Sequence, residues 1–510
     1  MKTAHNKNKL AAFLLASLLI SSFTACGSST GQETSISSDE ENKTPLNIAE
    51  TEPETEPVPE TEPVPELPQK NYNGENLTIL TKTEGNESGR WTDRGIYVEE
   101  ITGETVNDAI YNRNSLIQQQ YNCIIKQARM SLYDMPAGIT DLIAAGDTQY
   151  DIIMPNCTSA ASLSLSGVLY DLQDIGYVDL TKPWWNAQFT EDTTIGGKNY
   201  FANGDISETF MRATYAVFFN KQGILNYQLE NPYTLVSEGK WTMEKAQEMG
   251  TVFSSDIDGD GVKNDADNIG LIVLNNQIEC LYTASGEKLV QSTDDGFTFT
   301  GDTERSLAVL ETIYNLYTNK EAVLCATDPT RRSAATKSLG HVEVGEKTFS
   351  EGRCLFLMGT MNNVVAMREM DTDFGILPIP KADERQENYY SYANTWAASC
   401  AAIPISAGDP EKSAILLEEL AYQSREFYTP AYYEITLKTK VSRDQESAAM
   451  LDLIYERRTA DLGNLFSVGD VMSGVSQLIY PEEKNTFASF MVSKETAITA
   501  KLEEMQAFCN

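Results

Sequence analysis

The stretch DIDGDGVKNDAD, residues 256–267, places acidic side chains at alternate positions and ends on another acid. Counted from its first residue the pattern is D-x-D-x-D-G-x-x-x-x-x-D, in which the glycine allows a sharp turn. Calcium takes six to eight oxygen ligands at about 2.4 Å, and this spacing wraps such oxygens around one ion. We therefore expect a structural calcium site whose ligands are Asp256, Asp258, Asp260, the carbonyl of Val262, Asn264 and Asp267.

The elements around this loop argue against a calcium sensor. A sensor EF-hand needs a helix after the loop, whereas NIGLIVL, residues 268–274, has the pattern of a buried strand. A dockerin needs a second copy of the loop, and the sequence has none. The alternative is a solvated acidic turn, so the loop is either a calcium-tied connector or a plain one.

The N-terminus has the layout of an export signal. Lysines are followed by an apolar run from Leu10 to Ile20, which is too short for a comfortable membrane span. Phe23-Thr24-Ala25-Cys26 resembles the bacterial lipobox, which implies removal of a signal peptide, residues 1–25, and a lipid on Cys26. The alternative is an ordinary secretory signal with an incidental cysteine. We expect a protein anchored by lipid to the extracellular face of the cell membrane.

Residues 26–71 have the composition of a disordered stalk. Ser, Thr, Glu and Pro dominate, and TEPVPE occurs twice in succession, at 55–60 and 61–66. Such a segment cannot bury enough apolar surface to fold, and proline with repelling carboxylates extends it. The stalk would hold the folded body away from the membrane.

Charge and cysteine usage exclude several classes of function. The formal net charge is -35, so a nucleic acid would be repelled. The chain has eight cysteines without a C-x-x-C spacing, which gives no sign of a zinc site or a redox pair. His341 is the one histidine after the signal region, and no G-x-S-x-G motif lies near it in the sequence. No Walker A or G-x-G-x-x-G motif is evident either.

The body of the chain reads as alternating strands and helices. Strand, helix, strand, helix and strand follow one another in about 80 residues, which predicts an α/β lobe with a largely parallel sheet. These elements are expected at 76–83, 106–122, 123–130, 139–147 and 150–155.

A second series of the same kind follows, and the last 70 or so residues are rich in amphipathic helices. The second series has strands at 212–221, 268–274, 373–380 and 395–405, with helices at 241–253 and 410–423. At 510 residues the chain is long enough for two or three domains, or one bilobed unit.

Seven short motifs, in order, resemble the extracellular solute-binding proteins of ABC importers, of the maltose- and oligosaccharide-binding lipoprotein type. The resemblance covers essentially the whole body, and no single motif is diagnostic. The motifs are YDII at 150–153, GKNYF at 197–201, AVFFNK at 216–221, WTME at 241–244, FSEGRCLF at 349–356, DFGILPIP at 373–380, and Trp396 with Ile403-Pro404.

The resemblance implies a two-lobed α/β fold of the periplasmic-binding-protein type, with crossover hinges and a helix-rich C-terminal part. Lobe 1 would comprise 72–209 and 375–430, and lobe 2 would comprise 210–374 and 431–510. The crossovers should lie just before Arg212 and near Asp373. Ligands of such sheets occupy the crevice at the carboxyl ends of the strands, so a cleft between the lobes follows.

Residues suited to a sugar can be chosen within this frame. Sugars need an aromatic face for their C–H patches and polar groups for their hydroxyls. Trp184 and Trp185 are adjacent, so at most one of them should face the cleft, and Trp241 should be structural. The resemblance-guided candidates for the ligand site are Trp396, Trp91, Trp185, Asp205, Glu208, Asn394 and Asn156.

We expect a monomeric solute-binding protein that captures a sugar or oligosaccharide and delivers it to an ABC importer permease, without enzymatic turnover. A binder of peptides or other solutes on the same fold is the alternative, followed by a cell-surface hydrolase or adhesin. A glycosidase needs only two carboxylates, which an acidic chain can supply.

Overall fold

The computed structural model describes residues 63–509, except 86–88, 294–295, 368–369, 371–372, 439–444 and 480–486. The predicted signal peptide, the lipidation residue Cys26 and most of the predicted stalk lie outside the described residues. Within the part of the chain that is described, no helix combines the length and the hydrophobicity that a membrane span requires.

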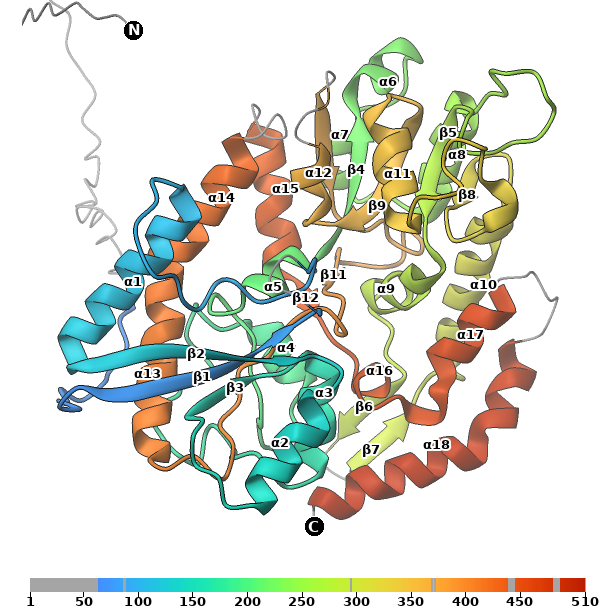
Figure 1. Ribbon diagram of the computed structural model, residues 1–510. Coiled ribbons are helices and arrows are strands. Elements are labelled where there is room, and N and C mark those ends of the chain that lie inside the picture. The colour runs from blue at the N-terminus through green and yellow to red at the C-terminus, as the bar shows by residue number, and fades with distance from the viewer. Residues whose placement is uncertain are drawn as a thin grey trace, which may run out of the picture. The chain divides into compact units, whose positions relative to one another are not determined.

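The first sheet has three parallel strands in the order β2-β1-β3 (Figure 1). These are β1 (Glu75–Thr83), β2 (Cys123–Ser131) and β3 (Ile152–Met154), joined by α1 (Thr105–Tyr121) and α2 (Met135–Ala144). The expected order of strands and helices is thereby confirmed. The central strand β1 buries Leu77, Ile79 and Leu80, which fits a strand covered on both faces.

The second sheet has five strands in the order β10-β4-β9-β5-β8. Its strands β5, β8 and β9 are parallel, whereas β4 runs antiparallel to both of its neighbours. The strands are β4 (Tyr215–Asn220), β5 (Ile269–Val273), β8 (Val323–Cys325), β9 (Cys354–Thr360) and β10 (Phe374–Leu377).

The chain passes between the two sheets through two segments that pair with each other. Thr214 forms an antiparallel bridge with Ala393, and the Asn394 N–H donates to the carbonyl of Ala213. The first crossing therefore lies next to Arg212. The second lies at Ala393–Asn394 instead of near Asp373.

The later crossing has a physical cause in the edge of the second sheet. The segment beginning at Phe374 extends this sheet as β10, which pairs with β4 over four residues. The chain then stays beside α8 (Met243–Phe253), where Lys381 bridges Thr242 and the Trp241 indole N–H donates to Pro378. Trp241 is fully buried, which agrees with its predicted structural role.

Residues 395–405, expected as a strand, form a series of isolated bridges instead. Ser399 bridges Asn156, and Ala402 bridges Ile153 at the edge of the first sheet. The segment meets a different partner at each bridge, with Ala401 opposite Ala202 and Pro404 opposite Leu169, so no continuous ladder forms. The segment still returns the chain to the first sheet, after which α13 (Pro410–Gln423) packs against α1.

The C-terminal part is helical, as predicted. Its helices are α14 (Thr429–Lys438), α15 (Gln445–Glu456), α16 (Leu462–Leu465), α17 (Val471–Ile479) and α18 (Phe487–Cys509). In Figure 1, α18 runs beside the hairpin formed by β6 (Val290–Thr293) and β7 (Gly296–Phe299).

The remaining described elements are mostly short helices between these strands. They are α3 (Cys157–Leu165), α4 (Ala187–Asp192), α5 (Glu208–Arg212), α6 (Lys221–Asn226), α7 (Pro232–Ser237), α9 (Ile278–Ala284), α10 (Glu304–Thr318), α11 (His341–Ser350), α12 (Asn363–Met367), β11 (Ser391–Tyr392), β12 (Arg458–Thr459), the 3-10 turns η1 (Asn275–Gln277), η2 (Pro329–Arg331) and η4 (Val468–Asp470), and the π-helical η3 (Ser424–Tyr428).

Candidate ligand-binding site

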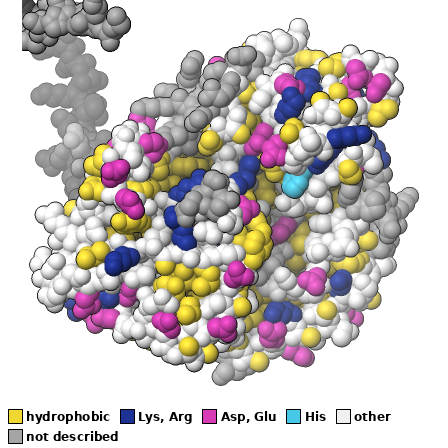
Figure 2. Space-filling view, viewed as in Figure 1, with side chains coloured by type: hydrophobic (Ala, Val, Ile, Leu, Met, Phe, Trp, Pro, Cys, Tyr) yellow, Lys and Arg dark blue, Asp and Glu magenta, His cyan; other side chains and the backbone are white. Residues whose placement is uncertain are grey.

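A cavity of about 300 Å³, here called the cleft cavity, is lined by residues of the second sheet and by residues that follow β1 of the first sheet. Arg90 and Trp91 come from the loop after β1, Leu274 follows β5, and Thr360 ends β9. The cavity therefore lies at the carboxyl ends of strands from both sheets, where open α/β sheets bind ligands. His341, the one histidine among the described residues and cyan in Figure 2, also lines it.

Trp396 presents the most accessible indole of this cavity. It lines the cavity, its side chain is 38% exposed, and its ring centroid lies 6.2 Å from that of Tyr133. The Trp396 N–H donates to Asn394 Oδ1 at 3.1 Å, and the Trp396 carbonyl accepts from Asn156 Nδ2 at 2.9 Å. An exposed aromatic face held by its own backbone is suited to stacking against a sugar ring.

The two asparagines predicted as ligand residues, Asn394 and Asn156, lie in different positions relative to the cleft cavity. Asn394 lines the cleft cavity, and its Nδ2 donates to the Tyr215 hydroxyl at 3.2 Å. Asn156 does not line the cavity: it is buried at the N-cap of α3, where its Oδ1 accepts from Ser159 N. Its contact with the cavity runs through Trp396 alone.

Trp91 forms a second, more buried wall. It is 9% exposed and lines the cavity, with the guanidinium carbons of Arg90 and Arg212 at 5.8 and 6.0 Å from its ring centroid. Its carbonyl accepts from Lys82, which is buried beside Asp93 at 3.7 Å. These contacts fix the loop after β1, so the indole keeps its orientation in the cavity.

Glu208 supports this wall and does not line the cavity, contrary to expectation. Its Oε1 lies 2.6 Å from Arg212 Nη1, four residues on along α5, and its Oε2 accepts from the Arg94 N–H at 2.6 Å. Residues four apart face each other on a helix, so Arg212 captures the carboxylate. Glu208 therefore holds the guanidinium that lies over Trp91.

A second hollow of about 420 Å³ adjoins the cleft cavity, and Asn276 lines both. Its other walls carry mostly amide and hydroxyl side chains. Glu279, which is half-buried, also lines it, with its carboxylate accepting from the Tyr392 hydroxyl. Burial raises the pKa of Glu279 to about 7.

Trp185 and Asp205, two further predicted ligand residues, line a different hollow of about 760 Å³. This hollow, here called the hinge cavity, shares no lining residue with the two described above. The backbone bridge between Trp185 and Gly204 holds both predicted residues together on this wall. The indole N–H groups of Trp184 and Trp185 both donate to Glu418, at 3.0 and 2.8 Å.

Sequence reasoning missed several residues of the cleft cavity. Tyr215, Asn276 and Asn363 line it, and Arg90 Nη2 pairs with Glu346 Oε1 of α11 at 3.0 Å. Tyr215 starts a predicted strand and His341 is a rare residue type, so both carried a weak signal. The ion pair joins residues 256 positions apart, so no local sequence pattern could predict it.

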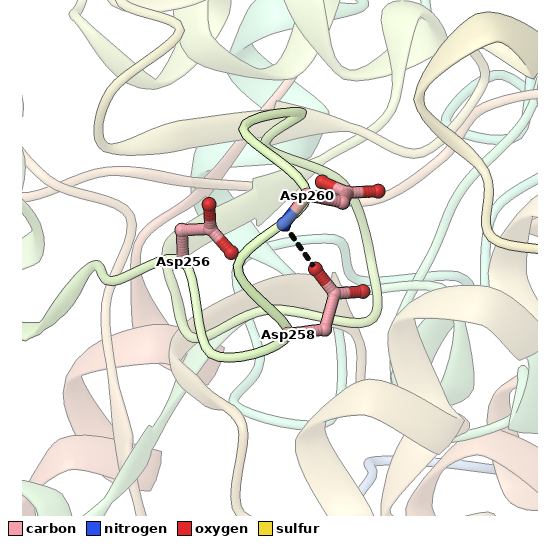
Figure 3. A group of neighbouring side chains, drawn as sticks. All are labelled: Asp256, Asp258 and Asp260. Carbon is pink, nitrogen blue, oxygen red and sulfur yellow. Dashed lines mark hydrogen bonds between the residues drawn. The ribbon is translucent and has the colours of Figure 1, made fainter.

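The acidic loop folds into a tight turn in which three of the six predicted calcium ligands meet (Figure 3). Ligand oxygens of Asp256, Asp258 and Asp260 lie within 4.8 Å of one another. Asp256 accepts from Gly259 N at 2.7 Å and Gly261 N at 2.9 Å, which lowers its pKa. Glycine at 259 and 261 has φ of 78° and 75°, conformations that side chains disfavour.

The other predicted ligands engage in bonds within the protein. Asp267 is buried and accepts from Ile257 N and Asn264 N, at 3.1 and 2.9 Å. The Val262 carbonyl accepts from Asn264 Nδ2 at 3.0 Å. Oxygen donors at these positions fit calcium chemically, and the six-ligand site stays a prediction.

Comparison with known proteins bears on the fold. A scan against protein-family models and a search of curated sequences gave no match. Solved structures do match. An ABC substrate-binding protein from Listeria monocytogenes, in complex with cycloalternan, has a TM-score of 0.53 and 12% identity, over 84% of this chain and 99% of that one.

Two further structures have the same degree of similarity. The cyclic α-maltosyl-1,6-maltose binding protein from Arthrobacter globiformis matches with a TM-score of 0.53 and 12% identity, over 84% of this chain and 99% of the other. UspC from M. tuberculosis matches with a TM-score of 0.53 and 11% identity, over 84% and 100%.

The chain has the two-lobed fold of periplasmic-type solute-binding proteins. The expected fold class is confirmed, and in this fold each sheet forms the centre of one lobe. The cleft cavity accordingly lies between the lobes, because strands of the second sheet and the loop after β1 of the first sheet both line it.

Proposed function

We propose that this protein binds a sugar, in particular an oligosaccharide, in the cleft cavity and does not transform it. The observation that carries the proposal is the pair of indoles, Trp396 and Trp91, on one cavity between the lobes. One indole is accessible enough to stack on a ring and the other is fixed by two guanidinium groups.

The polar groups around these indoles support a ligand rich in hydroxyls. Asn276, Asn363 and Asn394 line the cleft cavity, and each amide can both donate and accept. The adjoining hollow adds Ser473, Ser476 and Gln477. Because Asn276 belongs to both hollows, a ligand longer than one ring can occupy them together.

The ligands of two solved proteins with this fold also support a sugar as the ligand. The Listeria protein is in complex with cycloalternan, and the Arthrobacter protein binds a cyclic maltosyl-maltose. We carry the sugar class over as a proposal, and leave the identity of the sugar to experiment.

The cellular role follows from the sequence expectations. A lipid on Cys26 would hold the protein at the extracellular face of the membrane, with residues 26–71 as the stalk. The monomeric binding protein would then deliver its sugar to ABC importer permease subunits. Labelling cells with a clickable fatty acid tests the anchor, since wild-type protein should carry the label and a C26A variant should not.

We propose that the loop at 256–267 holds a structural calcium ion. Its three clustered carboxylates repel one another in the absence of a cation, which supports the proposal. The loop connects α8 to β5, within the second lobe, and none of its residues lines the cleft cavity. Calcium would stabilise the fold and take no part in binding the sugar.

A thermal-shift screen over oligosaccharides and peptides tests the function. A ligand at 100 times its dissociation constant adds about 2.7 kcal/mol of stability. We expect oligosaccharides to raise the melting temperature and peptides to leave it unchanged. If only peptides raise it, the protein is a peptide binder. Recovery of the unchanged sugar after incubation is expected, and cleavage products would indicate a hydrolase.

A further inference from the structure

The hinge cavity is the largest of the hollows described, at about 760 Å³. One wall is formed by residues 183–187 together with Gly204 and Asp205, close to the first sheet. The facing wall comes from the start of α14, the end of α15 and Arg458 of β12. The sugar proposal makes no use of this cavity.

Arg458, on the second wall, is a buried cation with almost no partners. The residue is 7% exposed. Its guanidinium makes one hydrogen bond with the described residues, from Nε to the Tyr455 carbonyl at 2.9 Å. Nη1 is buried and has no partner, and no carboxylate of the described residues forms an ion pair with the group. The guanidinium carbon lies 4.0 Å from the centroid of Phe210 and 5.1 Å from that of Tyr455.

A buried guanidinium with so few partners destabilises the fold unless a further hydrogen-bond acceptor binds it. An arginine stays protonated in proteins, and a buried charge without a partner is strongly destabilising. Buried polar groups that find no partner are rare, and an unassigned water or ion is a usual explanation. The aromatic contacts hold the guanidinium plane in place but accept no N–H bond.

The remaining charges of the cavity limit what this acceptor can be. Asp205 is occupied, since its Oδ1 accepts from the Thr429 hydroxyl at 2.7 Å and its Oδ2 lies 3.5 Å from Arg425 Nη1. Glu426, Asp452 and Glu456 are exposed and also line the cavity, so a multiply charged anion would be repelled. With Nε engaged, the guanidinium keeps its charge and its terminal N–H groups, which suit a carboxylate acceptor.

We propose that the hinge cavity is a second ligand site, which takes a small monocarboxylate on Arg458. The carboxylate pairs with the guanidinium of Arg458, and the rest of the molecule lies toward Trp185 and Tyr433. This site is independent of the sugar site, because the two share no lining residue. Sugar binding and carboxylate binding can therefore fail separately.

Sodium acetate and sodium lactate are suitable probes, each compared with sodium chloride at equal ionic strength. We expect either carboxylate to raise the melting temperature of the wild-type protein in a saturable way, beyond the effect of chloride. Arg458→Gln should abolish this increase. It should also leave the melting temperature without carboxylate unchanged or higher, because it removes an uncompensated buried charge.

Arg113 provides the matched control, because it is equally buried but its guanidinium makes hydrogen bonds to Asn114, Ser424 and the Ile96 carbonyl. Arg113→Gln should lower the melting temperature and keep the carboxylate effect. If Arg458→Gln does not fold, Arg458→Lys keeps the charge without the planar fork and should weaken acetate binding roughly tenfold. Equal effects of acetate, lactate and chloride on the wild-type protein would overturn the proposal, and so would a carboxylate effect that survives in Arg458→Gln.

Discussion

Arg90 Nη2 lies 3.0 Å from Glu346 Oε1, and this ion pair joins the loop after β1 in one lobe to helix α11 in the other. Glu346 Oε1 also accepts from Asn363 Nδ2 at 2.8 Å, and Asn363 lines the cleft cavity. Both Arg90 and Asn363 therefore border the proposed sugar site. Contacts between the lobes of this kind favour the arrangement in which both walls reach the ligand.

Glu346→Gln should weaken sugar binding by removing the charge of this pair. The side chains are partly exposed, so we expect a loss of about 1 kcal/mol, or roughly fivefold in affinity. The wild-type affinity should fall between 20 and 300 mM salt more than that of the variant, since salt screens the pair. The charge-swapped double variant, Arg90→Glu with Glu346→Arg, should recover part of the loss. An affinity that none of these changes alters would rule out the contribution of the pair.

Trp396→Ala should reduce sugar affinity roughly tenfold or more, because it removes the accessible stacking face. The melting temperature without sugar should change little, as the indole is 38% exposed. Tyr227→Ala is the matched control, because this aromatic is also 38% exposed but lies against Phe253, away from the cleft cavity. Titration calorimetry measures both variants, and equal affinities for the two would contradict the assignment of Trp396.

Glu279→Gln should change how stability depends on pH. Burial raises the pKa of Glu279 to about 7 in the folded protein, against about 4.5 in an unfolded chain. The folded protein thus keeps a proton that the unfolded chain releases, so this carboxyl favours folding less as pH rises from 4.5 to 7. The neutral amide cannot ionise, and its oxygen can still accept from Tyr392.

Urea unfolding at pH 4.5, 6 and 7 measures the effect. The free energy of unfolding of the wild type should fall relative to that of Glu279→Gln across this range, by on the order of 1–3 kcal/mol. Glu411→Gln is the control, because Lys70 lowers the pKa of this exposed carboxyl and the trend should not appear. Parallel curves for wild type and Glu279→Gln would show that the carboxyl ionises normally.

Removing calcium should lower the melting temperature of the protein. Calcium at 100 times its dissociation constant would stabilise the fold by about 2.7 kcal/mol, which a chelator removes. Asp258→Asn should reduce this response, whereas Asp302→Asn, an exposed carboxylate elsewhere, should retain it. A protein that contains no metal by elemental analysis, and melts alike with and without chelator, would be inconsistent with the site.

The succession of strands and helices was predictable because the spacing of apolar residues within each segment indicates a strand or a helix. The strand expected at 76–83 and the helix expected at 241–253 are present in the structure as β1 and α8. The second crossing was not predictable in this way. Phe374–Leu377 could belong to the second lobe or to the segment that leads the chain back to the first lobe. Its pairing with β4, some 150 residues earlier in the chain, decides between the two.

The site was predictable where an aromatic had no local structural purpose. Trp396 and Trp91 line the cleft cavity, as Asn394 does. The positions of the two predicted carboxylates could not be read from the sequence, because partners distant from the strand pattern determine them. Arg212 engages Glu208, whereas Arg425 and Thr429 engage Asp205. Trp185 points to the hinge cavity because Gly204 pairs with its backbone.

The central claim is that the cleft between the lobes binds a sugar, and calorimetric titration of the purified protein with a panel of oligosaccharides tests it most directly. We predict saturable heat at one site per chain with at least one oligosaccharide, and recovery of that sugar intact. The absence of heat with every sugar of the panel, together with saturable binding of a peptide, would contradict the claim.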